Sequence, residues 1–255
     1  MPQAHFGPIK VPEGPPDSRF VYLSDVLPTA WQAVEYADIP RGGTVAVLGL
    51  GPIGQMSARI AAHRGARVIG VDLVPERLAL AEKYGVETVL WHDREDVTAE
   101  LVQRTAGRGP DSVIEAVGTE AHGSPVTEFM QKATTLLPDR VGAAIAERVG
   151  SDRMTALLAA IDSVRRGGTI SIIGVYVGPT DPLPMMRLFD KGVTIRMGQA
   201  NVKKWVDDIL PLLEDDDPLG TGDFTTHVLP LSDAPDAYSM FQKKEDGAIK
   251  VLFQP

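Results

Sequence analysis

Short apolar runs alternate with amphipathic stretches through the middle of this chain. The apolar runs are predicted to be strands and lie at residues 45–48, 68–71, 87–90, 112–117, 169–175 and 193–197. The amphipathic stretches are predicted to be helices and lie at 23–37, 52–63, 76–84, 94–105 and 154–166. Strands separated by helices pair in parallel, and strands as apolar as 170–173 are buried on both faces. The pattern therefore predicts an α/β fold with a doubly wound parallel sheet.

The two ends of the chain depart from this alternation. Residues 1–17 contain five prolines and are predicted to form an extended connector. Residues 224–230, 233–243 and 248–253 are predicted to form a strand, a helix and a strand that join a different sheet. The acidic loop at residues 214–218, four acids followed by a proline, is predicted to be a solvated turn.

A glycine-rich motif, G-x-G-x-x-G, follows the first predicted strand at residues 49–54. Gly49 permits a tight turn, Gly51 lets the backbone approach a pyrophosphate, and Gly54 lets the next helix pack closely on the strand. That helix begins near Pro52 and directs its free N–H groups toward the phosphates. The motif therefore predicts the phosphate site of a dinucleotide-binding (Rossmann) fold.

Asp72 ends the second predicted strand, about twenty residues after the glycines, where such folds carry an acid. Its carboxylate would bind both ribose hydroxyls of NAD and would repel the 2′-phosphate of NADP. The alternative is that Asp72 only caps the helix that begins near Pro75. The paired motif favours NAD.

These observations divide the chain into three parts. They are a connector and first helix (1–40), a dinucleotide-binding domain (41–200) and a C-terminal part with further helices and strands (201–255). The stretch 119–150 is longer than a usual crossover and contains helical patches at 126–137 and 141–148. The C-terminal part begins with a helix through Trp205 and Ile209.

Composition narrows the possible partners. The formal net charge of -9, without a basic stretch, disfavours nucleic acid. No stretch approaches the length of a membrane span, and no secretory signal pattern is present, so we expect a cytoplasmic protein without a membrane partner. The chain has no cysteine, which excludes disulfides and thiolate metal sites.

Four stretches of the sequence and the closing residues 246–251 resemble medium-chain zinc-dependent alcohol dehydrogenases, most closely their glutathione-independent formaldehyde dehydrogenase branch. The four stretches are residues 23–30, 49–54, 72–78 and 198–203. The resemblance implies hydride transfer between NAD and a small alcohol or aldehyde. It implies a cofactor site of Gly51, Pro52, Ile53, Asp72, Arg77, Val117, His122, Ile173, Val175, Gly198 and Gln199, alongside Gly49 and Gly54 of the motif.

Independent support comes for five of these positions, because ligands of open parallel sheets bind at the carboxyl ends of strands. The five positions that follow predicted strands are Val117, Ile173, Val175, Gly198 and Gln199. His122 is either near the cofactor or an ordinary solvated loop histidine.

In the same family, zinc is held by a cysteine, a histidine and a third ligand, and it polarises the substrate oxygen. The resemblance assigns the third ligand to Asp25, whereas the other two have no counterpart, and the five histidines lie far apart in sequence. Asp25 is therefore either a remnant of a zinc site or a helix cap near Pro28. The resemblance implies that this chain is a carboxyl-terminal portion of such an enzyme, without the amino-terminal zinc-binding domain. The last strands of this chain would then belong to a truncated catalytic domain.

Two functions remain open from the sequence. The first is the NAD-binding portion of an alcohol or formaldehyde dehydrogenase that is inactive alone. The second is a non-catalytic NAD-binding or sensing module that acts through a partner. A methyltransferase also uses a glycine-rich turn and a strand-end acid, but the residues around the motif and after Asp72 disfavour it. The family commonly pairs subunits through the edge strand near Met197, which predicts a homo-oligomer, in the simplest case a dimer.

Overall fold

The computed structural model describes residues 5–118, 154–176, 183–214 and 216–255. The predicted helical patches at 126–137 and 141–148, and the candidate residue His122, lie outside these residues. The strands are β1 (Thr44–Leu48), β2 (Arg67–Asp72), β3 (Glu87–Leu90), β4 (Ser112–Glu115), β5 (Thr169–Ile172), β6 (Thr194–Met197), β7 (His227–Pro230) and β8 (Val251–Gln254). The α-helices are α1 (Asp17–Phe20), α2 (Val26–Ala37), α3 (Pro52–His63), α4 (Pro75–Glu82), α5 (Arg94–Arg104), α8 (Thr155–Ser163), α9 (Met185–Lys191), α10 (Val202–Ile209) and α11 (Ala234–Lys243). Short 3₁₀ helices are η1 (Val21–Ser24), η3 (Leu210–Leu213) and η4 (Leu231–Asp233).

Six strands form one parallel sheet in the order β3-β2-β1-β4-β5-β6. Successive side chains of β1 point to opposite faces, so Val45 and Val47 join one hydrophobic core while Ala46 and Leu48 join the other. The strand order reverses at β1, so the two halves of the chain wind outward from the middle of the sheet. The predicted doubly wound parallel sheet is confirmed.

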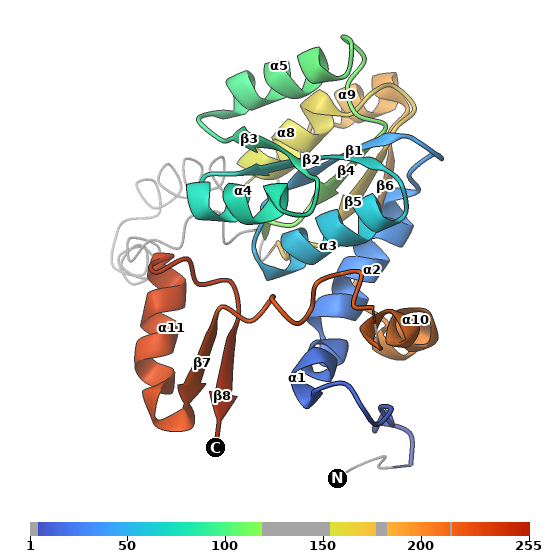
Figure 1. Cartoon of the computed structure of the whole chain (residues 1–255). Coiled ribbons are helices and arrows are strands. Elements are labelled where there is room, and N and C mark those ends of the chain that lie inside the picture. The colour runs from blue at the N-terminus through green and yellow to red at the C-terminus, as the bar shows by residue number, and fades with distance from the viewer. Residues whose placement is uncertain (1–4, 119–153, 177–182, 215) are drawn as a thin grey trace, which may run out of the picture.

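Helices cover both faces of this sheet (Figure 1). Buried side chains of α2, α3 and α4 form one core, and those of α5, α8 and α9 form the other. The strongest helix contact on the first face is between α2 and α3, and on the second between α5 and α8. Within the described residues, no helix is long and apolar enough to span a bilayer.

Two helices differ from the prediction. α8 ends at Ser163, earlier than predicted, because Val164 adopts an extended conformation with ψ 140°. α9 was not predicted at all. Leu188 is buried in it, whereas Met186 and Phe189 are exposed, so the sequence of α9 lacks the one-sided apolar pattern of an amphipathic helix.

The prediction of a solvated turn at 214–218 is wrong for Asp217. Its side chain is 12% exposed, and its carboxylate accepts hydrogen bonds from the N–H and the hydroxyl of Thr221 and from the N–H of Gly222. The guanidinium of Arg19, from α1, lies 3.8 Å from the same carboxylate. Asp217 therefore orders the segment after η3 instead of facing water.

The last part of the chain folds as predicted into a strand, a helix and a strand. β7 and β8 pair in parallel as a second, separate sheet, with Val228 opposite Leu252. α11 lies beside this sheet, away from the six-stranded one (Figure 1). The rings of Tyr238 and Phe253 stack with their centroids 6.5 Å apart, which links α11 to β8.

Arg59 on α3 connects the main sheet to the segment that leads into β7. Its guanidinium donates to the carbonyl oxygens of Leu219 and Gly220, at 3.1 and 3.0 Å. It also lies over the ring of Tyr84, 3.5 Å from the centroid. Arg59 is only 2% exposed, and this burial lowers the pKa of its guanidinium. Carbonyl dipoles and an aromatic face thus replace the water that a cation would have on the surface.

We expect Arg59→Met to lower the free energy of unfolding by about 3 kcal/mol, because two buried carbonyl groups lose their donor and an aromatic contact is lost. Urea denaturation measures this change. The control is Arg108→Met at an exposed position, which should change stability by less than about 0.5 kcal/mol. Equal effects of the two substitutions would contradict the role given to Arg59.

Candidate functional site

The glycine-rich turn brings the start of α3 against the end of β1. A Cβ on Gly54 would overlap the carbonyl oxygen of Gly49, and a Cβ on Gly49, whose φ is +86°, would lie 2.7 Å from Val117 Cγ2. Both positions therefore require glycine. Gly51 differs, because the nearest atom to a Cβ there would be Arg77 Nη1 at 3.9 Å, so this side of the turn is open.

α3 begins with residues suited to an anion. Gly51 is its N-cap and offers no side chain, and Pro52 is its first helical residue. Ile53 and Gly54 follow in the first turn, where backbone N–H groups lack helical partners and the helix dipole is positive. The predicted residues Gly51, Pro52 and Ile53 therefore form one open turn that can accept a phosphate.

Asp72 lies at the end of β2 and bonds to the same turn. Its carboxylate accepts hydrogen bonds from Leu50 N–H at 2.6 Å and from Val74 N–H at 2.9 Å. Arg77 Nη1 from α4 lies 3.7 Å from Asp72 Oδ2. Val74, not Asp72, is the N-cap of α4, so the alternative that Asp72 only caps this helix is wrong. The carboxylate joins β2 to the glycine-rich turn, with a cation beside it.

Glu115 organises the next strand end, where β4 stops two residues earlier than predicted. Its Oε1 accepts from the N–H groups of Val117 and Gly118, at 2.8 and 2.9 Å. Glu115 is fully buried, and this burial raises the pKa of its carboxyl group. A Cβ on Gly174 would overlap Glu115 Oε2, so the carboxyl group also lies against the turn after β5. The predicted residue Val117 is held in place by this acid.

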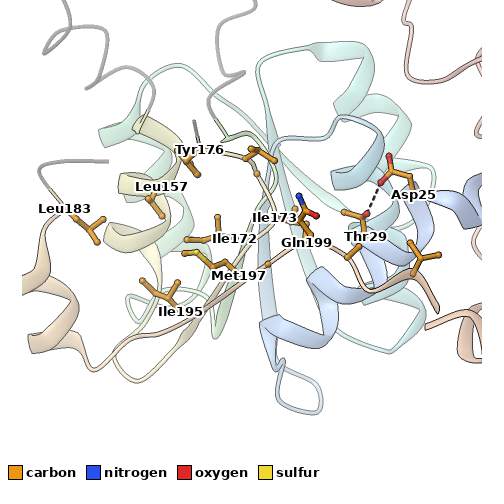
Figure 2. Close-up of a pocket in the computed structure, with 15 residues that line it drawn as sticks. Asp25, Thr29, Leu157, Ile172, Ile173, Tyr176, Leu183, Ile195, Met197 and Gln199 are labelled. Atoms are coloured by element: carbon orange, nitrogen blue, oxygen red, sulfur yellow. Dashed lines mark hydrogen bonds between the residues drawn. The ribbon is translucent and has the colours of Figure 1, made fainter. Parts of the chain in front are cut away.

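A cavity of about 670 Å³ opens at the carboxyl ends of β5 and β6. Five predicted residues line it, namely Asp25, Ile173, Val175, Gly198 and Gln199. Figure 2 shows Asp25 and Thr29 on one side and the apolar side chains of Leu157, Ile172, Leu183, Ile195 and Met197 on the other, with Ile173 and Gln199 between them. One wall is therefore polar and the opposite wall is aliphatic.

The glycine-rich turn and the cavity are connected through the ends of β4 and β5. Val117 packs against Gly49, and a Cβ on Gly118 would lie 2.5 Å from Val175 N. The structure thus brings the described candidates into one row along the carboxyl edge of the sheet, from Asp72 to Gln199. Such a row suits a long ligand better than a compact one.

Asp25 lies at the start of α2, at the edge of the cavity. It occupies the N-cap position of α2, but its carboxylate accepts a hydrogen bond from the Thr29 hydroxyl at 3.0 Å (Figure 2). Among the described residues, no group of three or more His, Cys, Asp or Glu side chains could hold a metal ion. The residues described here therefore do not fit a zinc ion, and no chemical step is assigned to one.

Sequence analysis missed two buried polar residues that shape this edge, Glu115 and Gln32. Glu115 stands in the apolar run Ser112–Glu115, where an isolated acid is a usable signal. Gln32 lies on the buried side of α2, where its amide bonds to the turn after β6. Its partners are more than 160 residues away in sequence, so no local pattern could have indicated them.

Comparison with known proteins agrees with this geometry. Residues 52–138 match the family model described as zinc-binding dehydrogenase. Over its whole length, the chain is 36% identical to an uncharacterized zinc-type alcohol dehydrogenase-like protein, AdhB, of Bacillus subtilis (strain 168), and it covers 64% of that protein. Over 87% of its length, it is 30% identical to a formaldehyde dismutase of Pseudomonas putida, of which it covers 54%.

A solved structure is also similar. The alcohol dehydrogenase TADH from Thermus sp. ATN1 matches with a TM-score of 0.76 and 29% sequence identity, over 97% of this chain and 61% of that one. The chain thus spans between 54% and 64% of the length of these three proteins.

We expect Glu115→Gln to stabilise the protein increasingly as the pH rises above 5. Because burial raises the pKa of Glu115 above its ordinary value of 4.5, the folded protein keeps a proton that the unfolded chain releases, and stability falls as the pH rises toward the folded pKa. The amide keeps an oxygen for Val117 and Gly118 but does not ionise. Urea denaturation between pH 5 and 8 should show that the stability of the variant relative to the wild type increases with pH.

The control for this measurement is Glu95→Gln, at an exposed position on α5, which should show no such trend. A stability difference between Glu115→Gln and the wild type that stays constant from pH 5 to 8 would contradict the prediction.

Proposed function

We propose, from the premise that this chain is related over its whole length to the medium-chain zinc-type alcohol dehydrogenases, that it binds NAD for hydride transfer to or from a small alcohol or aldehyde. The observation that carries the proposal is the row of strand ends that runs from Asp72 through the glycine-rich turn to the cavity beside Gln199. NAD has the matching shape, with an adenosine and a nicotinamide on either side of a diphosphate.

Each part of NAD has a proposed partner along this row. The diphosphate would lie on the N-terminus of α3, over Gly51, Pro52 and Ile53. The adenine-side ribose would donate hydrogen bonds from its hydroxyl groups to the carboxylate of Asp72. Arg77, which lies beside both Asp72 and Gly51, would attract a phosphate. The glycine cradle, which a Cβ would fill at Gly49 and Gly54, supports the fit of the cofactor.

The nicotinamide ring would enter the cavity, which supplies an apolar wall for the flat ring and exposed polar groups for its carboxamide. Ile173, Val175, Gly198 and Gln199 are the proposed contacts, with Val117 between ring and diphosphate. When bound, the ring accepts or donates the hydride. The chain's own contribution is to orient the ring and to exclude water from one of its faces.

We further propose that the chain belongs to the formaldehyde dehydrogenase branch of the family and that its substrate is a small aldehyde or alcohol. Similarity to a formaldehyde dismutase supports a small aldehyde or alcohol, and the aliphatic wall of the cavity favours a substrate without charge. Polarisation of the substrate oxygen is not assigned to a metal ion here, because the described residues form no metal site. His122 stays a proposed neighbour of the cofactor.

We also retain the division into a connector and first helix (1–40), an NAD-binding domain (41–200) and a C-terminal part (201–255) as a proposal. The relatives are dehydrogenases, which favours this function over a non-catalytic sensing module.

A fluorescence titration with NADH and NADPH tests the cofactor assignment. The wild-type chain should prefer NADH, and Asp72→Asn should raise the Kd for NADH by roughly tenfold or more and reduce this preference, because a charged acceptor of two hydroxyl groups is lost. Asp236→Asn, at an exposed position on α11, is the control and should bind as the wild type does. Equal affinity of the wild type for both nucleotides would count against the role of Asp72.

We further propose that the chain forms a dimer through β6 and α9. β6 is an outer strand of the described sheet, so one of its edges is open for pairing. Met186, Phe189 and Met197 on these elements are 79%, 85% and 62% exposed, so both elements present large apolar side chains to solvent.

Sedimentation velocity should find the wild type at twice the chain mass of 27.4 kDa and Phe189→Glu at the single mass, because a buried charge would destabilise the interface. Leu231→Glu changes another exposed residue, 58% accessible on η4, and should leave the dimer intact. A monomeric wild type would overturn the dimer proposal without affecting the cofactor assignment.

A further inference from the structure

Gln32 is buried in the middle of α2 and bonds to one distant turn with every polar group of its amide. Its Nε2 donates to the carbonyl oxygens of Gly198 and Gln199, at 3.1 and 3.0 Å. Its Oε1 accepts from Asn201 N–H at 3.0 Å and from the indole N–H of Trp205 at 3.2 Å. Gln32 is 1% exposed. Both donors and the acceptor oxygen of the amide therefore form hydrogen bonds with the turn at 198–201 and with α10, the helix that follows it.

The turn at 198–201 lies directly after β6 and lines the cavity through Gly198, Gln199 and Ala200. Gly198 has a φ of +148°, a conformation that other residues rarely adopt, and nothing lies within 4 Å of where its Cβ would be. A side chain added at Gly198 would therefore meet a strained backbone conformation and no steric clash. The two donors of Gln32 hold the turn's carbonyl groups toward α2, which leaves the other side of the turn facing the cavity.

We propose that Gln32 is a positioning residue that sets the Gly198–Gln199 turn against the nicotinamide half of NAD. The inference rests on the proposed function and adds to it a residue that never touches the cofactor. Glutamine suits the role because only a side-chain amide offers two donors and an acceptor oxygen at one place. A purely apolar residue would leave the turn free to shift, and a glutamate would set an oxygen against two carbonyl groups.

A role in folding alone and a role in positioning predict different binding data. NADH contacts the whole proposed row, whereas ADP-ribose keeps the diphosphate and both ribose groups and lacks only the nicotinamide ring, the part proposed to lie against Gly198 and Gln199. Loss of positioning at 198–199 should therefore weaken NADH and leave ADP-ribose unchanged. General loss of structure should weaken both ligands.

The test is isothermal titration calorimetry of NADH and ADP-ribose with the wild type, Gln32→Glu and Gln32→Met. Gln32→Glu keeps the acceptor for Asn201 and Trp205 but loses both donors, and Gln32→Met loses all four bonds at similar size. We expect both to raise the Kd for NADH about tenfold or more and to leave the Kd for ADP-ribose within about twofold. Gln103→Met, at an exposed position on α5, is the matched control and should change neither.

A second measurement does not depend on cofactor affinity. Hydrogen exchange followed by NMR should find the Asn201 amide and the Trp205 indole N–H less protected in Gln32→Met than in the wild type, while amides of β1 keep their protection.

Each outcome decides the question. A weaker affinity of the Gln32 variants for NADH but not for ADP-ribose, together with faster hydrogen exchange at the Asn201 amide, supports the inference. Unchanged NADH affinity in both variants, or parallel loss of NADH and ADP-ribose, would overturn it and leave the proposed function standing. A wild-type chain that binds neither ligand would instead overturn the proposed function and this inference with it.

Discussion

The close approach of α3 to the end of β1 is the contact on which the candidate site depends. The first turn of this helix can reach the strand only because Gly49 and Gly54 have no side chains, since a Cβ on Gly54 would overlap the Gly49 carbonyl oxygen. Val117 fills the remaining space above Gly49. A larger residue at Gly49 would displace the segment after β4, and one at Gly54 would displace the N-terminus of α3, on which a phosphate is proposed to bind.

Three buried polar side chains hold the loops at the carboxyl edge of the sheet in one conformation. Asp72 bonds to the glycine-rich turn, Glu115 to the turn after β4, and Gln32 to the turn after β6. Burying an unpaired polar group costs about 1–3 kcal/mol, so each of these groups favours the one loop conformation that satisfies it. All three residues lie in helices or strands and form hydrogen bonds with the backbone of neighbouring loops. In this way the rigid helices and strands fix the conformation of the loops.

The sheet, the two-stranded C-terminal unit and the glycine-rich turn could be predicted because their signals are local. The six strands follow apolar runs, and the motif at 49–54 directly precedes a helix that begins at Pro52. α9 could not be predicted in this way, because Phe189 is exposed and breaks its pattern. Asp217 was misjudged because a run of acids suggests solvent, whereas its hydrogen bonds to Thr221 and Gly222 depend on a turn that no pattern encodes.

Polarity along the carboxyl edge of the sheet also favours one orientation for the proposed cofactor. At one end, Asp72 and Arg77 carry opposite charges 3.7 Å apart, and at the other the cavity wall is aliphatic. NAD carries a ribose on both sides of its diphosphate, so the two orientations differ in their bases: in the reverse one the adenine would lie in the cavity and the nicotinamide ring beside Asp72 and Arg77. The nicotinamide ring would then lose the aliphatic wall that keeps water from one of its faces. The difference between the charged end and the aliphatic end of the row therefore favours the proposed orientation, in which the nicotinamide ring lies at the cavity.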